Sequence, residues 1–202
     1  MENTAAIFMC SHRSGGNSFD AANFFRQGVE EAGGQAFVYN LKKFKVEPCT
    51  ACGVCAKDKR HRCPLDGKDF ARELFTALKV APFVFFASPI YFYHLPSIFK
   101  TWIDRSQMHW CAWDAGDEGL RALPERPAYT CLVAGRDRGD KLFEGALLTM
   151  KYFLKPFNLR FADPVALLNT DKAGDLRANE AAATALVELG KAAWFEHAPQ
   201  EV

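Results

Sequence analysis

The sequence of 202 residues lacks an apolar run long enough to cross a bilayer, and it lacks a strong excess of charge of either sign. Its most apolar stretch, 80–87, is broken by Pro82, whereas a membrane-spanning helix needs about 20 apolar residues. The N-terminus shows no basic patch followed by an apolar stretch, which would mark a secretory signal. A formal net charge of +1 gives no bias toward nucleic acid or anionic membranes. We therefore expect a cytoplasmic protein without nucleic-acid or membrane partners.

Internal repeats, low-complexity segments and recognisable domain boundaries are also missing. A chain of this length fits one domain with one hydrophobic core. We expect residues 1–202 to form a single domain, with a cysteine-rich loop insert at about 41–66.

What the sequence does contain is a regular alternation of short apolar runs and helical patterns. The apolar runs typical of buried strands are 5–10, 35–40, 82–87, 128–134 and a segment near 159–168. Helical spacing or helix start signals follow each of them, at about 18–32, 70–78, 96–105, 141–157 and 178–195. Five strand–helix units predict an α/β fold with a parallel sheet covered by helices on both faces. The doubly wound, flavodoxin-like strand order 2-1-3-4-5 accommodates five such units.

In such a sheet, ligands bind beyond the carboxyl ends of the strands, where the strand order reverses. That point lies between the first and third strands, so the relevant loops are 11–18, 88–94 and the neighbouring 135–140. The first loop opens a helix, whose free amides and dipole attract anions. Its candidate phosphate-binding residues are Ser11, Arg13, Ser14, Gly16, Asn17 and Ser18. An ordinary strand–helix turn with an N-cap at Asn17 or Ser18 is the alternative.

The loop after the third strand offers aromatic faces and a backbone stiffened by proline. A flat ring system could lie there, with backbone amides at its polar edge. The candidate ring-binding residues are Ser88, Pro89, Ile90, Tyr91, Phe92 and His94, joined by Gly135, Arg136 and Gly139 of the next loop. The alternative is that the aromatic residues only cover the core.

The sequence lacks the residues required for two other activities found on this fold. A tyrosine phosphatase needs an arginine six positions after its nucleophilic cysteine, and Gly16 stands six positions after Cys10. A phospho-acceptor receiver domain needs an aspartate at the end of the third strand, where Ser88 stands.

Four motifs, in this order, resemble the NADPH-dependent FMN reductase family of the flavodoxin-like superfamily. They are Ser11-x-Arg13-x-x-Gly16-Asn17-Ser18, the four cysteines described below, Ser88-Pro-Ile-Tyr91, and Phe99-Lys-Thr-Trp-Ile-Asp-Arg105. The resemblance implies FMN, with its phosphate in loop 11–18 and its ring against 89–92 and 135–139. It also implies hydride transfer from NAD(P)H, electron transfer to a small acceptor such as a flavin or a quinone, and a homodimer or tetramer. No catalytic residue is expected, because the flavin carries the chemistry.

The cysteine-rich insert places Cys49, Cys52, Cys55 and Cys63 in the pattern Cys-x2-Cys-x2-Cys-x7-Cys. This pattern resembles that of iron–sulfur flavoproteins and implies a [4Fe–4S] cluster beside the flavin, although zinc or no metal are alternatives. With a cluster, a ferredoxin-like protein would be the electron donor. A third possibility is a flavin-binding regulatory protein without turnover. Among the other residues, Cys10 and Cys131 are expected to be buried, and Asp104-Arg105 to form a structural ion pair.

Overall fold

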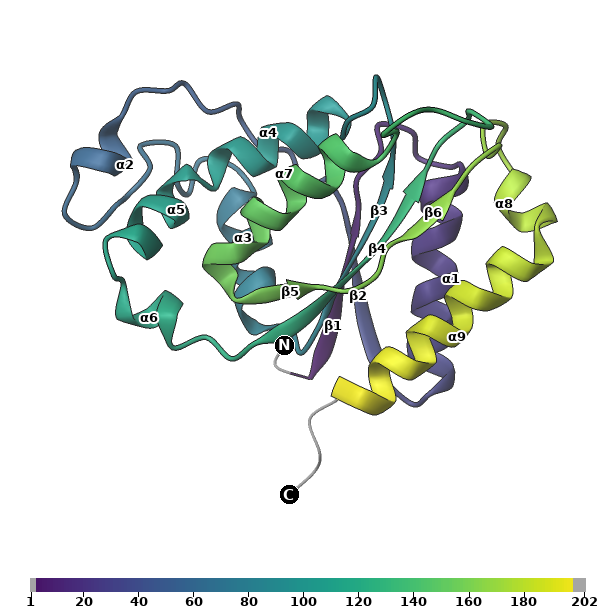
Figure 1. Ribbon diagram of the computed structural model, residues 1–202. Helices are drawn as coiled ribbons and strands as arrows, with labels where there is room; N and C mark the ends of the chain where they lie inside the picture. The colour runs from purple at the N-terminus through teal and green to yellow at the C-terminus, as the bar shows by residue number, and fades with distance from the viewer. Residues whose placement is uncertain (1–2, 198–202) are drawn as a thin grey trace.

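A parallel β-sheet forms the centre of the molecule in the computed structural model, which describes residues 3–197 (Figure 1). Its strands are β1 (Thr4–Met9), β2 (Gln35–Asn40), β3 (Val84–Pro89), β4 (Arg126–Val133), β5 (Leu159–Phe161) and β6 (Val165–Leu167). They lie in the order β2-β1-β3-β4-β5, with β6 also paired to β4, and all of these pairs are parallel. The predicted flavodoxin-like strand order is therefore confirmed.

The fifth predicted strand, 159–168, is divided in two. β5 pairs with the beginning of β4, and β6 pairs with its end, so both lie along the same edge of β4. Pro164 lies between the two pieces, and proline has no N–H to donate to a neighbouring strand. The sheet consequently has six strands rather than the five predicted.

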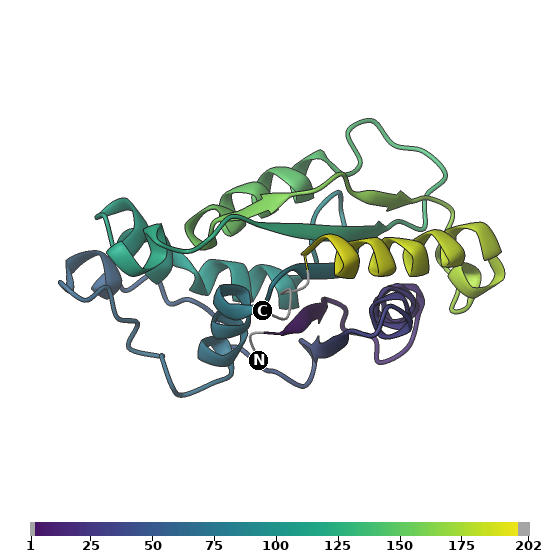
Figure 2. The same cartoon turned by 90° about the horizontal axis from the view of Figure 1, so that it is seen from below.

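Helices cover both faces of the sheet (Figures 1 and 2). One face carries α1 (Asn17–Glu31), α8 (Asp175–Ala178) and α9 (Glu180–His197). The other face carries α3 (Ala71–Val80), α4 (Ser97–Arg105) and α7 (Glu144–Leu154). Four shorter helices lie in connections: α2 (Val54–Lys57), α5 (Gln107–Asp114), α6 (Glu118–Arg121) and the 3₁₀ helix η1 (Lys155–Phe157). The predicted loop 41–66 thus contains α2, and the stretch between α4 and β4, for which no element was predicted, contains α5 and α6.

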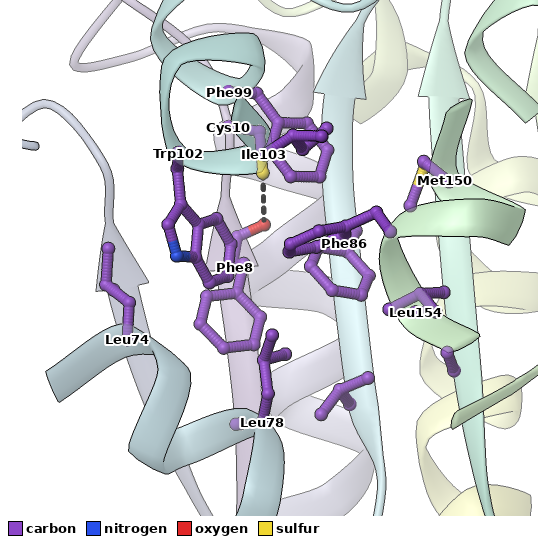
Figure 3. Close-up of a cluster of buried hydrophobic side chains, with 14 of the residues drawn as sticks. Phe8, Cys10, Leu74, Leu78, Phe86, Phe99, Trp102, Ile103, Met150 and Leu154 are labelled. Atoms are coloured by element: carbon purple, nitrogen blue, oxygen red, sulfur yellow. Dashed lines mark hydrogen bonds between the residues drawn. The ribbon is translucent and has the colours of Figure 1, made fainter. Parts of the chain in front are cut away.

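The expected single hydrophobic core is divided by the sheet into two clusters, one on each face, because successive side chains of a strand point to opposite sides. Phe8 of β1, and Cys10 just after it, point toward α3 and α4, whereas Ile7 points toward α1. Figure 3 shows Phe8 between Phe86 and Trp102, with ring centroids 5.0 and 4.9 Å away. Both faces of the central strands are buried, which explains their uninterrupted apolar sequences.

Cys10 is buried as expected, and its Sγ donates to the Phe8 carbonyl oxygen at 3.5 Å (Figure 3). Burial raises the pKa of the Cys10 thiol and raises that of Cys131 to about 12. Both thiols are therefore inert core side chains. No helix within residues 3–197 has the length and apolar character needed to cross a membrane.

Candidate functional site

The carboxyl ends of β1, β3 and β4 surround a cavity of about 140 Å³. Predicted site residues that line it are Ser11, Arg13, Gly16, Asn17, Ser18, Pro89, Ile90, Tyr91 and Gly135. It lies where the strand order reverses, as the fold requires of a ligand site. The loops that follow three different strands therefore converge on one cavity.

Several cavity residues were not predicted: Gly15, Phe19, Val133, Thr170 and Asp171. Thr170 and Asp171 follow β6, whose end lies beside the end of β4. The rule that ligands bind at the carboxyl ends of strands points to this loop too, once the last strand is assigned to the edge of β4.

The first turn of α1 has the geometry of an anion site. Gly16 precedes the helix with φ of 139°, a value that residues with a side chain rarely adopt. Among the described residues, the amides of Asn17, Ser18 and Phe19 have no backbone acceptor, and the first helical bond runs from the Asp20 amide to the Gly16 carbonyl oxygen at 3.0 Å. Free amides at a helix N-terminus, with the dipole behind them, favour a bound phosphate.

The side chain of Asn17, predicted to bind phosphate, instead forms hydrogen bonds with a neighbouring loop. Its Nδ2 donates to the carbonyl oxygens of Thr170 and Lys172, at 3.2 and 3.0 Å, and its Oδ1 accepts from the Leu176 amide at 3.1 Å. The side chain is thus committed to holding loop 170–176 against the start of α1. Only the backbone amide of Asn17 is available to a ligand.

The loop after β3 is a tight two-residue turn. Tyr91 and His94 exchange backbone hydrogen bonds of 2.9 and 3.0 Å, while Phe92 and Tyr93 between them have φ of 49° and 63°. The left-handed region is unfavourable for bulky residues, and such strain is concentrated at functional sites. Tyr91 lines the cavity, whereas the Phe92 side chain is 103% exposed and points into solvent.

Other predicted residues lie around the cavity without lining it. The hydroxyl of Ser14 accepts from Lys42 Nζ at 2.9 Å, and the buried hydroxyl of Ser88 donates to the Pro89 carbonyl oxygen at 3.1 Å. His94 Nε2 is 3.0 Å from the hydroxyl of Thr149. Arg136 lies over the ring of Tyr93, 5.5 Å from its centroid, and a side chain at Gly139 would meet the hydroxyl of Tyr93. These residues support the loops.

The four cysteines of the insert line a separate cavity of about 470 Å³, together with Cys111 of α5. This cavity shares no lining residue with the one at α1, so the structure gives no support to the expected position beside the flavin. Within the described part of the chain, no group of three or more His, Cys, Asp or Glu side chains is arranged to hold a metal ion. The cysteines thus share a cavity without forming the expected ligand set.

The environments of these thiols differ. Burial raises the pKa of Cys55, and the neighbouring thiols of Cys111, Cys63 and Cys49 raise it further. The exposed Cys52 has a lowered pKa, because the Val54 amide and the Thr50 hydroxyl stabilise its thiolate.

The ion pair expected for Asp104 and Arg105 does not form. Arg105 pairs with Asp69, and Asp104 pairs with Lys100 on the surface of α4. Neighbours in a helix point in different directions, since successive residues are rotated by about 100°. Arg105 therefore enters the interior while Asp104 stays half-exposed.

Solved structures share this fold over most of the chain. An NAD(P)H:quinone oxidoreductase from Methanothermobacter marburgensis is 19% identical and superposes with a TM-score of 0.72, covering 98% of each chain. An azoreductase from Bacillus anthracis str. Sterne is 13% identical with a TM-score of 0.61, covering 94% of this chain and 97% of that one. The Trp repressor binding protein from Bacillus subtilis is 18% identical with a TM-score of 0.59, covering 92% and 98%. No curated protein matches the sequence.

The family comparison is more specific than these distant structures, which show the fold alone. The model of the family described as NADPH-dependent FMN reductase matches residues 4–158. The match spans β1 to η1, and with them the loops after β1, β3 and β4 that line most of the cavity. The chain therefore belongs to the NADPH-dependent FMN reductase family and is an NAD(P)H-dependent oxidoreductase that uses FMN.

Proposed function

We propose that the protein transfers electrons from NAD(P)H to a small acceptor, a free flavin or a quinone. The observation that carries this proposal is the convergence of a phosphate-type helix N-terminus and a proline- and tyrosine-containing loop on one cavity. When bound, FMN supplies the redox chemistry, and the protein binds, orients and shields it. The similarity to an NAD(P)H:quinone oxidoreductase supports the choice of acceptor.

In this proposal the phosphate lies at the start of α1. The amides of Asn17, Ser18 and Phe19 would donate to it, with the hydroxyls of Ser11 and Ser18 and the guanidinium of Arg13. The residues fit an anion, because no carboxylate lies in loop 11–18 and the nearby Asp20 is paired with Arg177 at 2.9 Å.

The flavin ring would lie against Pro89, Ile90 and Tyr91. The Ile90 amide donates to the Val133 carbonyl oxygen at 2.8 Å, which holds this loop to the end of β4. Across from it, Gly135 has no room for a side chain, since a Cβ there would lie 2.9 Å from Asp171. The glycine therefore lets the loops after β4 and β6 approach each other beside the ring.

The remaining predicted site residues would act through these loops. Ser14, Ser88, Phe92, His94, Arg136 and Gly139 are proposed to shape the loops that contact FMN. We also propose that residues 1–202 act as one FMN-binding domain with the insert at 41–66, in the cytoplasm. A homodimer or tetramer would cover the exposed Phe92 at the rim of the site, as burial of such a side chain is favourable. Light scattering of the FMN-loaded protein measures the assembly.

The test is steady-state oxidation of NADPH and NADH by the FMN-loaded protein, with a benzoquinone or free FMN as acceptor. We expect turnover that requires both the nucleotide and the acceptor. Rapid reduction of the bound flavin without turnover would support NAD(P)H as the electron donor but reject a benzoquinone and free FMN as acceptors. No reduction by either nucleotide would reject the proposal and favour a protein electron donor or a regulatory role.

A further inference from the structure

Cys111 lies far from the insert in the sequence, yet it lines the same cavity as the four insert cysteines. It is on α5, which packs directly against α2, the short helix of the insert. Figure 1 shows α2 beside α5 at the end of the molecule away from α1 and α9, and Figure 2 shows the same neighbourhood from below. The tertiary structure thus brings a fifth thiol to the insert.

Cys55 is the insert cysteine that lies on α2, the helix packed against α5. Cys55 and Cys111 are half-buried, whereas Cys49 and Cys52 are exposed. Of the neighbouring thiols that raise the pKa of Cys55, Cys111 has the largest effect. Cys63, although half-buried too, acts on Cys55 more weakly.

Two thiols on packed helices that line one cavity meet the first requirement for a reversible disulfide, which is that the two side chains lie in one place. The positions of the helices limit which sulfurs can meet, and a disulfide tolerates only a narrow range of distances and angles. Because its pKa is raised, Cys55 is mainly a neutral thiol, and the disulfide would form through its small thiolate fraction.

We propose that Cys55 and Cys111 form a reversible disulfide that links the cysteine-rich insert to α5. The oxidant is a low-molecular-weight disulfide such as glutathione disulfide. One thiolate attacks it, forming a mixed disulfide and releasing one glutathione thiolate; the second protein thiolate then attacks the protein sulfur and releases the other. Two protein thiols are oxidised to one disulfide, and one glutathione disulfide is reduced to two glutathione molecules.

The disulfide would constrain a helix that leads to the FMN site. α5 follows α4 with only Ser106 between them. At the start of α4, the hydroxyl of Ser97 lies 2.9 Å from Nε2 of His12, which is in loop 11–18. The insert and loop 11–18 are thus connected through α4 and α5.

The experiment maps the disulfide by mass spectrometry. The full-length, FMN-loaded protein is reduced, oxidised with glutathione disulfide, alkylated and digested with trypsin without reduction. Trypsin separates the segments 46–57, 63–68 and 106–121, which contain Cys55, Cys63 and Cys111 respectively. We expect a cross-linked peptide that joins 46–57 to 106–121 and is lighter by two hydrogens than the sum of its parts.

Since 46–57 also contains Cys49 and Cys52, the variants Cys49→Ser and Cys52→Ser serve as matched controls. Both should keep the cross-link, whereas Cys55→Ser should lose it while retaining bound FMN. The same oxidation in urea should give mainly disulfides within 46–57, because short loops close more readily in an unfolded chain. A native disulfide within 46–57, a link from 46–57 to 63–68, or thiols that stay reduced would each overturn the proposal.

Discussion

Arg105 and Asp69 form a buried ion pair, with Arg105 Nη1 2.5 Å from Asp69 Oδ2 and side chains only 1% and 5% exposed. The same carboxylate accepts from the amides of Glu47 and Ala71, at 2.8 and 3.0 Å. Arg105 Nη1 also donates to the Glu47 carbonyl oxygen at 2.9 Å. The pair therefore joins the end of α4, the start of α3 and the segment that enters the cysteine-rich insert.

Replacing Asp69 with Asn should destabilise the protein strongly, because it leaves the Arg105 charge buried without its partner. Loss of one member of a buried pair costs about 3–5 kcal/mol. The matched control is Asp66→Asn, which breaks the more exposed pair with Arg72 and should cost at most about 1 kcal/mol. Urea denaturation of both variants measures the difference. Equal losses would show that the buried pair contributes no more than a surface pair.

The stability that Asp69 provides should depend on pH. Burial by itself would raise the pKa of Asp69, but hydrogen bonds from the Ala71 and Glu47 amides and from Arg105 outweigh it, so the pKa is lowered. A carboxylate with a lowered pKa in the folded state stabilises it above its unfolded pKa, about 3.9, and loses that effect as the pH falls through the folded value. The difference in unfolding free energy between wild type and Asp69→Asn should be constant from about pH 8 to 5 and shrink below about pH 4. A difference that grew in acid would contradict this.

Arg13→Ala should weaken FMN binding by about 1.5–3 kcal/mol, the range for hydrogen bonds to charged groups. Riboflavin has no phosphate, so its affinity should change little. Arg160→Ala removes a guanidinium that is 78% exposed on β5, beside the beginning of β4 and outside the cavity, and should leave both affinities unchanged. Fluorescence titration of the apoprotein measures them. If Arg13→Ala bound FMN like wild type, the phosphate would have to lie elsewhere.

Gly16→Ala should reduce both stability and FMN affinity, each by about 1–3 kcal/mol, because φ of 139° strains a residue with a Cβ. Gly15→Ala, the adjacent control, should be tolerated, since its Cβ would meet no atom within 4 Å and its φ is not positive. Thermal unfolding with and without FMN separates the two effects. Equal behaviour of the two variants would show that the helix entry relaxes without cost.

Tyr91→Ala should weaken FMN by about 1 kcal/mol, the scale of an aromatic contact, and should change the fluorescence and reduction potential of the bound flavin. Phe37→Ala removes a 48% exposed aromatic side chain from the edge strand β2, outside the cavity, and should change neither property. If the fluorescence and reduction potential of the bound flavin were unchanged in Tyr91→Ala, the Tyr91 side chain would serve only to pack the loop.

The sequence by itself determined the order of strands and helices and the loops that form the site. Those features depend on local patterns. The apolar run 5–10 is a strand segment buried between the two layers of helices, and the polar loop 11–18 that follows it leads into α1. The handedness and order of the crossovers then leave few arrangements, so the ends of β1, β3 and β4 had to meet. This is why most of the predicted cavity residues line the cavity.

Only the tertiary structure decided which distant groups meet. Asn17 contacts Thr170 across 153 positions of the chain, Arg105 selects Asp69 over its neighbour Asp104, and Cys111 joins the insert cysteines. The close approach of α1 to α9 is another example, because a Cβ at Gly28 would lie 1.9 Å from the Val187 carbonyl oxygen. The local pattern of apolar and polar residues specifies which face of a helix or strand is buried. They do not specify the distance between two elements, which depends on how all the side chains between them pack.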